Sequence, residues 1–231
     1  RIESLETVRQ DFIANVSHEL RTPLTVFNGF LETLESTPLD SADAKKYIGL
    51  MKTQAENMQH LVENLLTLAS LESPDSEPDV QTIAIDALLL QLEVDARALS
   101  HGRHKITLEV AEGSTLMGNK AEIYSAFTNL VTTAIRYTPD GGNIQLRWTD
   151  TPDAGMFEVV DNGIGIAAEH IPRLTERFYR VDRGRSRQTG GTGLGLAIVK
   201  HVALRHGAWL EVDSELGKGS TFRLVFPKKP I

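Results

Sequence analysis

Apolar residues recur at steps of three and four along the first 34 residues, the spacing that places them on one face of a helix. This stripe consists of Leu5, Val8, Phe12, Val16, Leu20, Leu24, Phe27, Leu31 and Leu34. At about 100° per residue, His18 lies about 200° from the two stripe residues that flank it, so it faces outward. Thr22, four residues later, shares that outward face. Pro23 has no N–H group for the carbonyl of Glu19, and we expect the helix to bend there.

The exposed pair His18-Glu19 has three interpretations. The plainest is a solvated histidine beside an ordinary helix charge. A zinc protease needs the pattern His-Glu-x-x-His, but Thr22 occupies the fifth position. The other histidines do not restore metal-ligand spacing, and the chain has no cysteine. The motif Ser17-His-Glu-Leu-Arg-Thr-Pro23 therefore favours a reactive histidine.

A second amphipathic helix is predicted from about Ser41, which has the chemistry of an N-cap, to about Glu72. A turn through Pro38-Leu39-Asp40 joins the two helices into a hairpin. The second helix carries a heptad seam of Ile48, Met51, Ala55, Met58, Val62, Leu65 and Ala69. Two helices cannot cover this much apolar surface between themselves, so we predict a homodimer in which a second copy completes a four-helix bundle. The alternative is a hairpin that packs on its own second domain.

A polar stretch with two prolines, residues 73–79, is typical of a linker. Beyond it, helices are predicted near 85–99, 121–137 and 194–206. Strands are predicted near 105–110, 144–149, 156–160, 209–212 and 221–226. This order predicts an α/β sandwich with one sheet face covered by helices. The expected domains are a hairpin over residues 1–72 and a second domain over residues 80–231.

Composition narrows the class of protein. With 231 residues, of which 41% are hydrophobic, the chain can bury a sizeable core. A formal charge of −7 argues against a general nucleic-acid binder. No apolar run reaches the roughly 18 residues of a membrane span, and the absence of cysteine suits a reducing compartment. Because the chain begins at Arg1 without a signal peptide, we expect a fragment of a longer protein.

Two glycine-rich segments lie in the second domain. Asp161-Asn-Gly-Ile-Gly165 follows an apolar strand, and Gly190-Gly-Thr-Gly-Leu-Gly195 opens a helix. Glycines allow close approach of a phosphate, and a helix N-terminus offers free N–H donors to an anion, although a simple turn needs the same residues. Neither segment has the spacing of a P-loop or of a dinucleotide fingerprint.

A basic, apolar-poor stretch precedes the second glycine segment. Its arginines, with one just upstream, are Arg173, Arg177, Arg180, Arg183, Arg185 and Arg187. In this position the stretch predicts a lid that closes over a polyphosphate, the alternative being a solvated basic loop.

Taken together, these motifs resemble the sensor histidine kinases of two-component systems over nearly the whole chain. The matching motifs are the phosphoacceptor sequence 17–23, an asparagine box at 129–139, Asp161-x-Gly163-x-Gly165, Arg177-Phe-Tyr-Arg180 and Gly191-x-Gly193-x-Gly195. Stretches 174–182 and 188–196 are most similar to the phosphate-regulon sensors within that family.

The resemblance implies a dimerisation and phosphotransfer hairpin followed by an ATP-binding domain of the Bergerat type, shared with gyrase and Hsp90. It implies that Asp161 accepts the adenine amino group, that Tyr137 flanks the base and that Arg136 and Arg180 contact phosphates. The ATP-binding residues that it implies are Asn129, Thr133, Arg136, Tyr137, Asp161, Gly163, Gly165, Phe178, Arg180, Gly191, Gly193 and Gly195.

One position departs from the family pattern. Asparagine boxes carry a second asparagine four residues after the first, whose carbonyl binds Mg²⁺, and this chain has Thr133 there. Asn129 and Thr133 are therefore the implied metal ligands, with Thr133 the shorter of the two. A misplaced metal slows phosphoryl transfer, so we expect weakened kinase activity. Whether the threonine is natural or introduced stays open.

The implied reaction is attack of neutral His18 on the γ-phosphate of Mg-ATP, with Glu19 as the base. The phosphoryl group then passes to an aspartate of a response regulator, and Thr22 positions the water that dephosphorylates that regulator. A weakened kinase that mainly binds or dephosphorylates the regulator is the alternative. An ATP-hydrolysing machine is disfavoured because Asn129 stands where a glutamate base is expected. The resemblance also implies the cytoplasmic portion of an inner-membrane protein.

Overall fold

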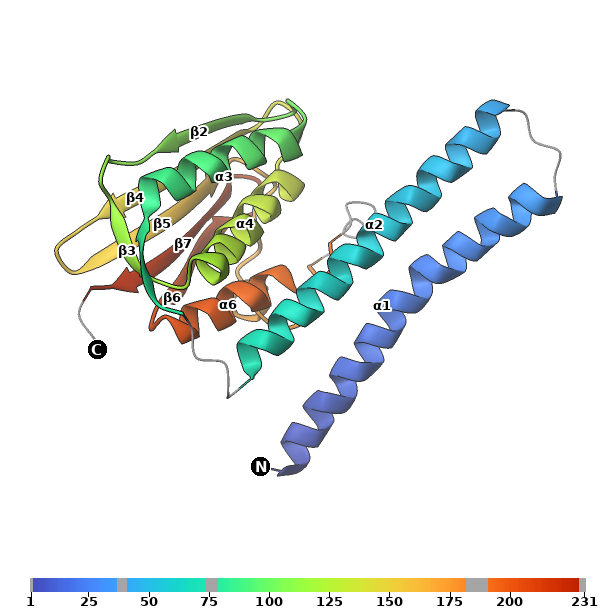
Figure 1. Cartoon of the computed structure of the whole chain (residues 1–231), viewed down its shortest axis with the longest axis horizontal. Coiled ribbons are helices and arrows are strands. Elements are labelled where there is room, and N and C mark those ends of the chain that lie inside the picture. Colours follow the sequence, from blue (N-terminus) through green and yellow to red (C-terminus); the bar gives the residue numbers. More distant parts are fainter. Residues whose placement is uncertain (1, 37–40, 74–78, 182–190, 229–231) are drawn as a thin grey trace. The chain divides into compact units, whose positions relative to one another are not determined.

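The computed structural model describes residues 2–36, 41–73, 79–181 and 191–228 (Figure 1). They form two compact units. The first contains α1 (Ile2–Ser36) and α2 (Ser41–Glu72) up to Leu66, and the second contains most of the chain from Thr67 onward. None of the helices within these described ranges combines the length and apolarity that a bilayer-spanning helix needs.

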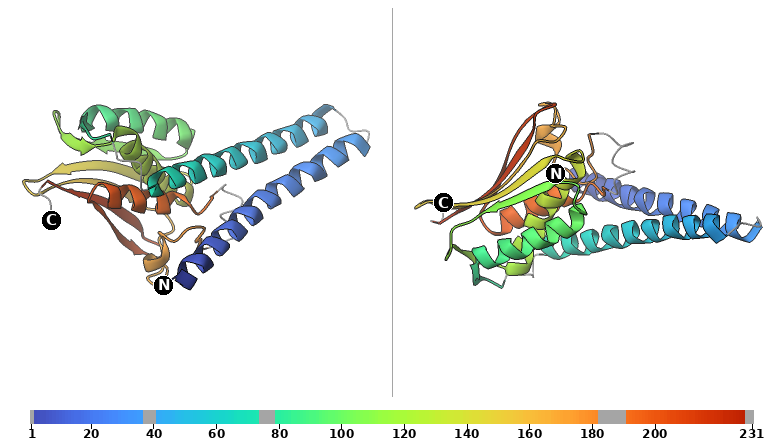
Figure 2. Two further views of the ribbon diagram at one scale, coloured as in Figure 1. Left: turned by 60° about the horizontal axis from the view of Figure 1, so that its bottom comes forward. Right: turned by 90° about the horizontal axis from the view of Figure 1, so that it is seen from above.

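The first unit is the predicted helical hairpin. The helices α1 and α2 run side by side in opposite directions (Figures 1 and 2). The rings of Phe30 and Tyr47 meet across them, with centroids 5.5 Å apart. Pro23 lies inside α1, so the proline does not end the helix. The predicted turn at 38–40 and most of the predicted linker, residues 74–78, lie outside the described residues.

The second unit is an α/β sandwich. Its elements are β1 (Gln81–Ala84), α3 (Ile85–Ser100), β2 (Lys105–Glu109), β3 (Thr115–Gly118), α4 (Lys120–Tyr137), β4 (Asn143–Asp150), β5 (Ala154–Asp161), the 3₁₀ helix η1 (Ile171–Arg173), α6 (Gly195–Arg205), β6 (Trp209–Glu215) and β7 (Gly219–Pro227). The main sheet has the order β2-β4-β5-β7-β6, with β2 and β4 parallel and the other neighbours antiparallel.

Helices α3, α4 and α6 cover one face of this sheet, as predicted (Figure 2). Every second side chain of a strand points to the same face of the sheet, and the buried residues alternate along these strands. One face of the sheet is therefore apolar and is covered by the helices. Phe127 of α4 stacks on Phe157 of β5 with ring centroids 4.0 Å apart, and both are fully buried. The core therefore lies between the helices and one sheet face.

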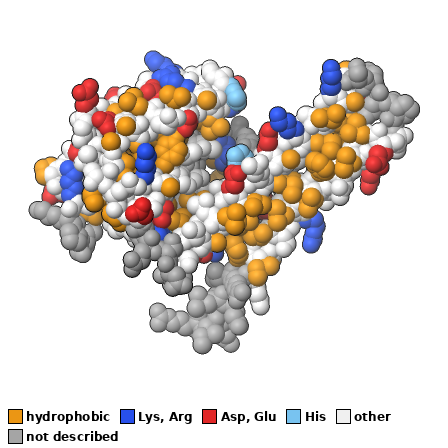
Figure 3. Space-filling view, in the orientation of Figure 1, with side chains coloured by type: hydrophobic (Ala, Val, Ile, Leu, Met, Phe, Trp, Pro, Cys, Tyr) orange, Lys and Arg blue, Asp and Glu red, His pale blue; other side chains and the backbone are white. Residues whose placement is uncertain are grey.

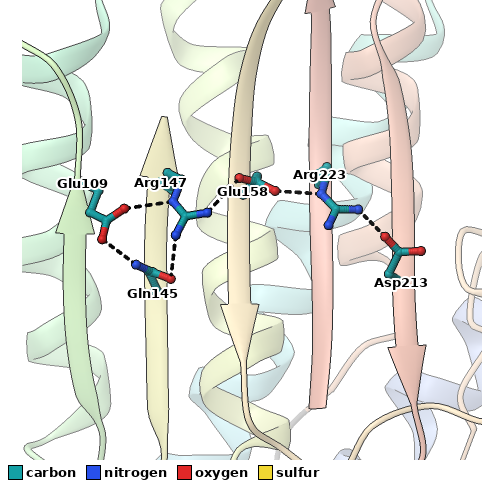
Figure 4. A network of polar contacts seen from close by, with 6 residues as sticks. All are labelled: Glu109, Gln145, Arg147, Glu158, Asp213 and Arg223. Atoms are coloured by element: carbon teal, nitrogen blue, oxygen red, sulfur yellow. Dashed lines mark hydrogen bonds and ion pairs between the residues drawn. The ribbon is translucent and has the colours of Figure 1, made fainter. Parts of the chain in front are cut away.

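The other sheet face carries charged side chains instead. A ladder of ion pairs and hydrogen bonds crosses five strands in the order Glu109, Arg147, Glu158, Arg223 and Asp213 (Figure 4). Glu158 is only 7% exposed because the two arginines flank it, at 3.6 Å from Arg147 and 2.7 Å from Arg223. Because opposite charges are paired, this uncovered face can hold charged side chains without burying an unpaired charge.

Two short strands were not predicted. Strands β1 and β3 pair with each other in a separate two-stranded sheet, from Gln81 opposite Gly118 to Ala84 opposite Thr115. Each has four residues, and in β1 only Ile83 is buried. Four residues with a single buried side chain give too little alternation to distinguish a strand from a loop.

Candidate functional site

The predicted phosphoacceptor face lies on α1. His18 and Thr22 are both exposed, which confirms that they share an outward face, and Glu19 is half-buried. The Thr22 hydroxyl donates to the backbone carbonyl of His18 at 3.2 Å. Its oxygen keeps lone pairs that can accept a hydrogen bond from water. The surface can therefore present an imidazole and a hydroxyl to the same incoming molecule.

Helix α4 carries the predicted asparagine box. The helix is anchored at its start, because the Asn119 side chain accepts from the Glu122 N–H at 3.0 Å and the Asn119 N–H donates to His206 Nε2 at 3.1 Å. Its buried face consists of Ile123, Ala126, Phe127, Leu130, Val131, Ala134 and Ile135. Its half-buried positions include Asn129, Thr133, Arg136 and Tyr137. The apolar face thus orients the polar residues away from the core.

The side chains of Asn129 and Thr133 test whether Mg²⁺ fits this helix. Asn129 Nδ2 donates to the Ser125 carbonyl at 2.9 Å, which leaves Oδ1 as an oxygen ligand. A Cβ on Gly195 would lie 2.6 Å from that Oδ1, so the amide oxygen faces the start of α6. The Thr133 hydroxyl donates to the Asn129 carbonyl at 2.7 Å, and its shorter oxygen keeps lone pairs. An amide and a hydroxyl oxygen suit a Mg²⁺ ion whose other ligands are phosphates and water.

Two arginines form the basic side of the site. Burial lowers the pKa of the Arg136 guanidinium, the Tyr137 phenol opposes this, and the positive charge of Arg180 adds to the lowering. Arg136 and Arg180 are therefore near enough to repel each other. A polyanion would stabilise positive charge in such a partly buried place, so the phosphate contacts of both residues stay a prediction that this environment permits.

The carboxylate of Asp161 lies at the end of β5 and is 8% exposed. Its Oδ1 accepts from the Gly163 N–H at 2.8 Å. Burial raises the pKa of Asp161, while hydrogen bonds from the backbone N–H groups of Gly163 and Ser220 oppose the rise. A buried carboxylate that already accepts hydrogen bonds from backbone N–H groups is suited to accept a further one from a neutral donor such as an amino group.

The glycines after Asp161 are required by close approach. A Cβ on Gly163 would lie 2.5 Å from the Tyr137 carbonyl oxygen. Gly165 has φ +68, and its Cβ would lie 2.0 Å from the backbone oxygen of Glu215. The Ile164 N–H also donates to the Tyr137 carbonyl at 3.1 Å. The contacts of Gly163 and Ile164 attach the Asp161 loop to the end of α4 and place Tyr137 beside it, while Gly165 packs against the end of β6.

The second glycine segment meets the predicted aromatic motif. The Phe178 N–H donates to the Gly193 carbonyl at 2.8 Å, and Phe178 has φ 61, an uncommon backbone conformation for this residue type. A Cβ on Gly193 would lie 2.8 Å from Phe178 Cα. Gly191 is buried and Gly195 begins α6. The predicted lid residues 182–190 lie outside the described residues.

Sequence reasoning missed contacts of two histidines near these motifs. His170 Nδ1 lies 2.7 Å from the Tyr179 hydroxyl, and the Arg173 guanidinium lies 4.3 Å from the centroid of the Tyr179 ring. His104 is buried and contacts the residue that follows Tyr137. Neither histidine belongs to a motif. His170 lies between two motifs in the sequence, whereas nothing in the sequence around His104 points to its contact.

The described part of the second unit contains hollows of different sizes. A cavity of about 100 Å³ is lined by Arg136, Tyr137, Thr138, Pro139 and Ile164, at the end of α4. A larger pocket of about 600 Å³ lies between β1, α3 and the start of α4. None of the residues predicted to bind a nucleotide lines the larger pocket, so we place the candidate site at the end of α4.

Two family models match the chain in the predicted order. The His Kinase A (phospho-acceptor) domain matches residues 8–74. The histidine kinase-, DNA gyrase B-, and HSP90-like ATPase matches residues 118–230. The first match includes His18, and the second includes α4 and both glycine segments.

Relatives and solved structures agree with these matches. The phosphate regulon sensor protein PhoR of Pseudomonas aeruginosa is 52% identical over 228 residues, which cover 98% of this chain and 52% of PhoR. Full-length ShkA in complex with AMPPNP is 26% identical with a TM-score of 0.68, covering 94% of this chain and 45% of ShkA. ThkA in complex with the response regulator protein TrrA is 20% identical with a TM-score of 0.79, covering 99% of this chain and 64% of ThkA.

The chain spans about half the length of the PhoR relatives that it matches. The two matched domains follow one another as the phosphoacceptor hairpin and the ATPase-like sandwich seen in the structure. The chain therefore belongs to the sensor histidine kinases of two-component systems and is similar, over almost all of its length, to the phosphate regulon sensor PhoR.

Proposed function

We propose that this chain is a kinase core that transfers the γ-phosphoryl group of ATP to His18 and then to an aspartate of a response regulator. The observation that carries the proposal is the site at the end of α4. There a buried carboxylate, a half-buried arginine and closely packed glycines belong to one unit. These are the groups that a purine nucleotide with a phosphate chain requires.

Each group has a distinct role in holding the nucleotide. Asp161 accepts a hydrogen bond from the adenine amino group, and the Tyr137 ring flanks the base. Arg136 and Arg180 neutralise phosphate charge, and the N-terminus of α6 at Gly195 offers backbone N–H donors. Asn129 Oδ1 and the Thr133 hydroxyl would hold Mg²⁺, which supplies charge neutralisation between phosphates.

The chemistry at His18 is a displacement at phosphorus. A neutral ring nitrogen of His18 attacks the γ-phosphorus, so an N–P bond forms while the bond to the β-phosphate oxygen breaks and ADP leaves. The proton on the other ring nitrogen passes to Glu19, the adjacent carboxylate. Exposure of His18 on α1 supports this role, because both a nucleotide-bearing domain and a regulator must reach it.

A second copy of the hairpin completes the functional unit. Large apolar side chains remain exposed along α1 and α2, and Figure 3 shows hydrophobic side chains gathered along the helices. They include Leu24, Val26, Leu31, Ile48, Leu50, Val62 and Leu66. A homodimeric four-helix bundle buries this surface.

The same face of α1 is also suited to a second reaction, the dephosphorylation of the response regulator. Thr22 lies one turn after His18, and its hydroxyl oxygen can accept a hydrogen bond from the attacking water. The solved complex of ThkA with the response regulator TrrA has a fold like this chain's, which supports a receiver domain as the partner. By similarity to PhoR, we propose that the complete protein is an inner-membrane phosphate sensor and that this chain is part of its cytoplasmic portion.

A second candidate function follows from Thr133. Its hydroxyl proton is donated to the Asn129 carbonyl, and its oxygen reaches less far than an asparagine amide would. A weakly held metal slows phosphoryl transfer, which would leave a chain that mainly binds or dephosphorylates its regulator.

Nucleotide binding is the first test of the proposal. Titration calorimetry with Mg-ADP should show binding to the wild-type chain and at least about tenfold weaker binding to Asp161→Asn, because an amide can present a donor where the base also donates. Equal affinity of the two proteins would overturn the role of Asp161, and absence of binding by the wild type would overturn the proposed function.

A further inference from the structure

His104 is a buried histidine in the turn between α3 and β2. It is 8% exposed and belongs to no motif of the sequence. Its Nε2 lies 2.8 Å from the carbonyl oxygen of Thr138, which is 34 residues away. Its Nδ1 lies 3.0 Å from the hydroxyl of Ser100, and the same hydroxyl accepts from the His104 backbone N–H at 3.0 Å.

These partners are compatible with one neutral tautomer. A carbonyl can only accept, so Nε2 carries the proton and donates to Thr138. Nδ1 is then the acceptor, and the Ser100 hydroxyl donates to it while accepting from the His104 N–H. Every polar atom of the imidazole is satisfied, and the ring orientation is determined from both sides.

Thr138 connects this imidazole to the candidate nucleotide site. It caps the C-terminus of α4, and its N–H donates to the Ala134 carbonyl at 3.0 Å. The Thr138 hydroxyl is buried and has no hydrogen-bond partner in the described part of the chain. The hydrogen bonds that the structure shows for Thr138 are made by its backbone N–H and carbonyl groups. The preceding residue, Tyr137, contacts Gly163 and Ile164 of the Asp161 loop through its carbonyl.

The end of α4 is therefore held from two sides. The Asp161 loop contacts the Tyr137 carbonyl, and His104 contacts the next carbonyl along the chain. The cavity of about 100 Å³ beside them is lined by residues 136–139 and Ile164. A shift of the Thr138 carbonyl would move Arg136 and Tyr137 relative to Asp161, because all of them belong to one short stretch of backbone.

We propose that His104 is a positioning residue for the nucleotide, whose neutral imidazole holds the Thr138 carbonyl and so sets the place of Tyr137 and Arg136 opposite Asp161. This inference rests on the proposed nucleotide-binding function. It assigns His104 no contact with the nucleotide itself. Its effect is to keep the binding groups of α4 and of the Asp161 loop at the separation that the base and the phosphates require.

Other contacts join the turn that contains His104 to the residues that follow α4, so loss of the imidazole need not unfold the domain. The Gly141 N–H donates to the Arg103 carbonyl, and the Lys105 N–H donates to the Gly142 carbonyl at 2.9 Å. A Cβ on Gly142 would lie 2.2 Å from Thr138 Cγ2, so the loop also packs closely. These contacts leave the loop attached when His104 is replaced.

The test compares two substitutions of His104. His104→Leu keeps an apolar body without a donor, whereas His104→Gln keeps an N–H donor that can reach the Thr138 carbonyl. We expect Mg-ADP to bind His104→Leu about tenfold more weakly by calorimetry, and His104→Gln to bind within about threefold of the wild type. The binding of Mg-ADP to both variants is measured at a temperature below the onset of thermal unfolding. That onset is determined for each variant in a separate experiment without nucleotide.

The outcomes separate positioning from simple stability. An unchanged dissociation constant in His104→Leu, with only a lower unfolding midpoint, would overturn the positioning role. Equal weakening in His104→Leu and His104→Gln would also overturn it, since the donor would then be irrelevant. Absence of Mg-ADP binding by the wild type would overturn the proposed function and the inference that depends on it.

Two further variants keep the test decisive. His101→Asn changes an exposed histidine of the same turn, whose φ of 50 an asparagine tolerates, and should bind like the wild type. If His104→Leu does not fold, Ser100→Ala removes the hydroxyl partner of Nδ1. We expect Ser100→Ala to bind several-fold more weakly, and unchanged binding by it would overturn the inference.

Discussion

The hydroxyl of Thr133 donates a hydrogen bond of 2.7 Å to the backbone carbonyl of Asn129, one helical turn earlier. Such a bond back to residue i−4 holds the threonine oxygen close to its own helix. Asn129 meanwhile directs its amide oxygen to the start of α6. The two residues are thus unequal candidates for a shared metal ion, and this inequality separates the two functions proposed for the chain.

Replacing this threonine should increase kinase activity. In Thr133→Asn the longer side chain carries an amide oxygen that can reach a metal bound between the phosphates, so we expect phosphohistidine to form about tenfold faster or more. The measurement is the initial rate at saturating Mg-ATP.

Thr132→Asn is the matched control. It makes the same chemical change about 100° away around α4, so we expect the rate of the wild type. A rate in Thr133→Asn that is no higher than in Thr132→Asn would show that position 133 does not limit the reaction.

Asp161→Asn should weaken nucleotide binding but, towards neutral pH, increase the stability of the fold relative to the wild type. Burial raises the pKa of Asp161 in the folded protein, so the folded state binds this proton more tightly than the unfolded state. Stability from this group is therefore lost as the pH rises from the unfolded value near ~3.9 through the raised value. The asparagine variant does not lose it.

We therefore expect the stability of Asp161→Asn relative to the wild type, without nucleotide, to rise as the pH increases from about 4 to 7. Urea unfolding at a series of pH values measures this difference. A difference that falls with increasing pH would mean that the Asp161 carboxylate is stabilised by the fold, contrary to the raised pKa.

Long periodic elements could be predicted from the sequence, and short or irregular ones could not. Helices α3 and α4 begin and end within one residue of their predicted bounds, because apolar spacing extends over several turns. Strands β5 and β7 were predicted from their alternation but are longer at both ends. Strands β1 and β3 depend on pairing with each other, which no local pattern reveals.

The parts of the candidate site that belong to sequence motifs could be predicted from the sequence. The contact of Phe178 with Gly193 joins two motifs that the sequence had already singled out. The bond from His104 to Thr138 could not be predicted, because it joins positions 34 residues apart through a single unremarkable histidine. The electrostatic relation of Arg136 to Arg180 likewise depends on the tertiary fold.

The charged ladder on the open sheet face gives a test of stability. Glu158→Gln removes the negative charge between Arg147 and Arg223, so two arginines lose their shared partner (Figure 4). We expect a loss of about 1–3 kcal/mol in the free energy of unfolding. Urea unfolding measures it.

Glu109→Gln is the control at the end of the ladder, where the carboxylate is more than half exposed. Exposed ion pairs contribute little, so we expect a loss below about 1 kcal/mol. If both variants lost the same amount, burial of Glu158 between the arginines would not matter.

The homodimer can be tested on the exposed seam of α2. Val62 is 44% exposed in the single chain, and we expect it to be buried in the dimer. Val62→Glu would place a charge in that apolar interface and should shift the protein toward monomer in sedimentation velocity. Glu63→Gln, at an exposed polar neighbour, should stay dimeric. A monomeric wild type at micromolar concentration would refute the predicted bundle.

Incubation with Mg²⁺ and γ-labelled ATP tests the kinase most directly, with protein phosphate scored as acid-labile and base-stable. We expect slow labelling of the wild type, faster labelling of Thr133→Asn, and none when His18→Ala is added to either background. If nucleotide binds but neither the wild type nor Thr133→Asn acquires label on His18, the chain is not a histidine kinase core of the kind proposed.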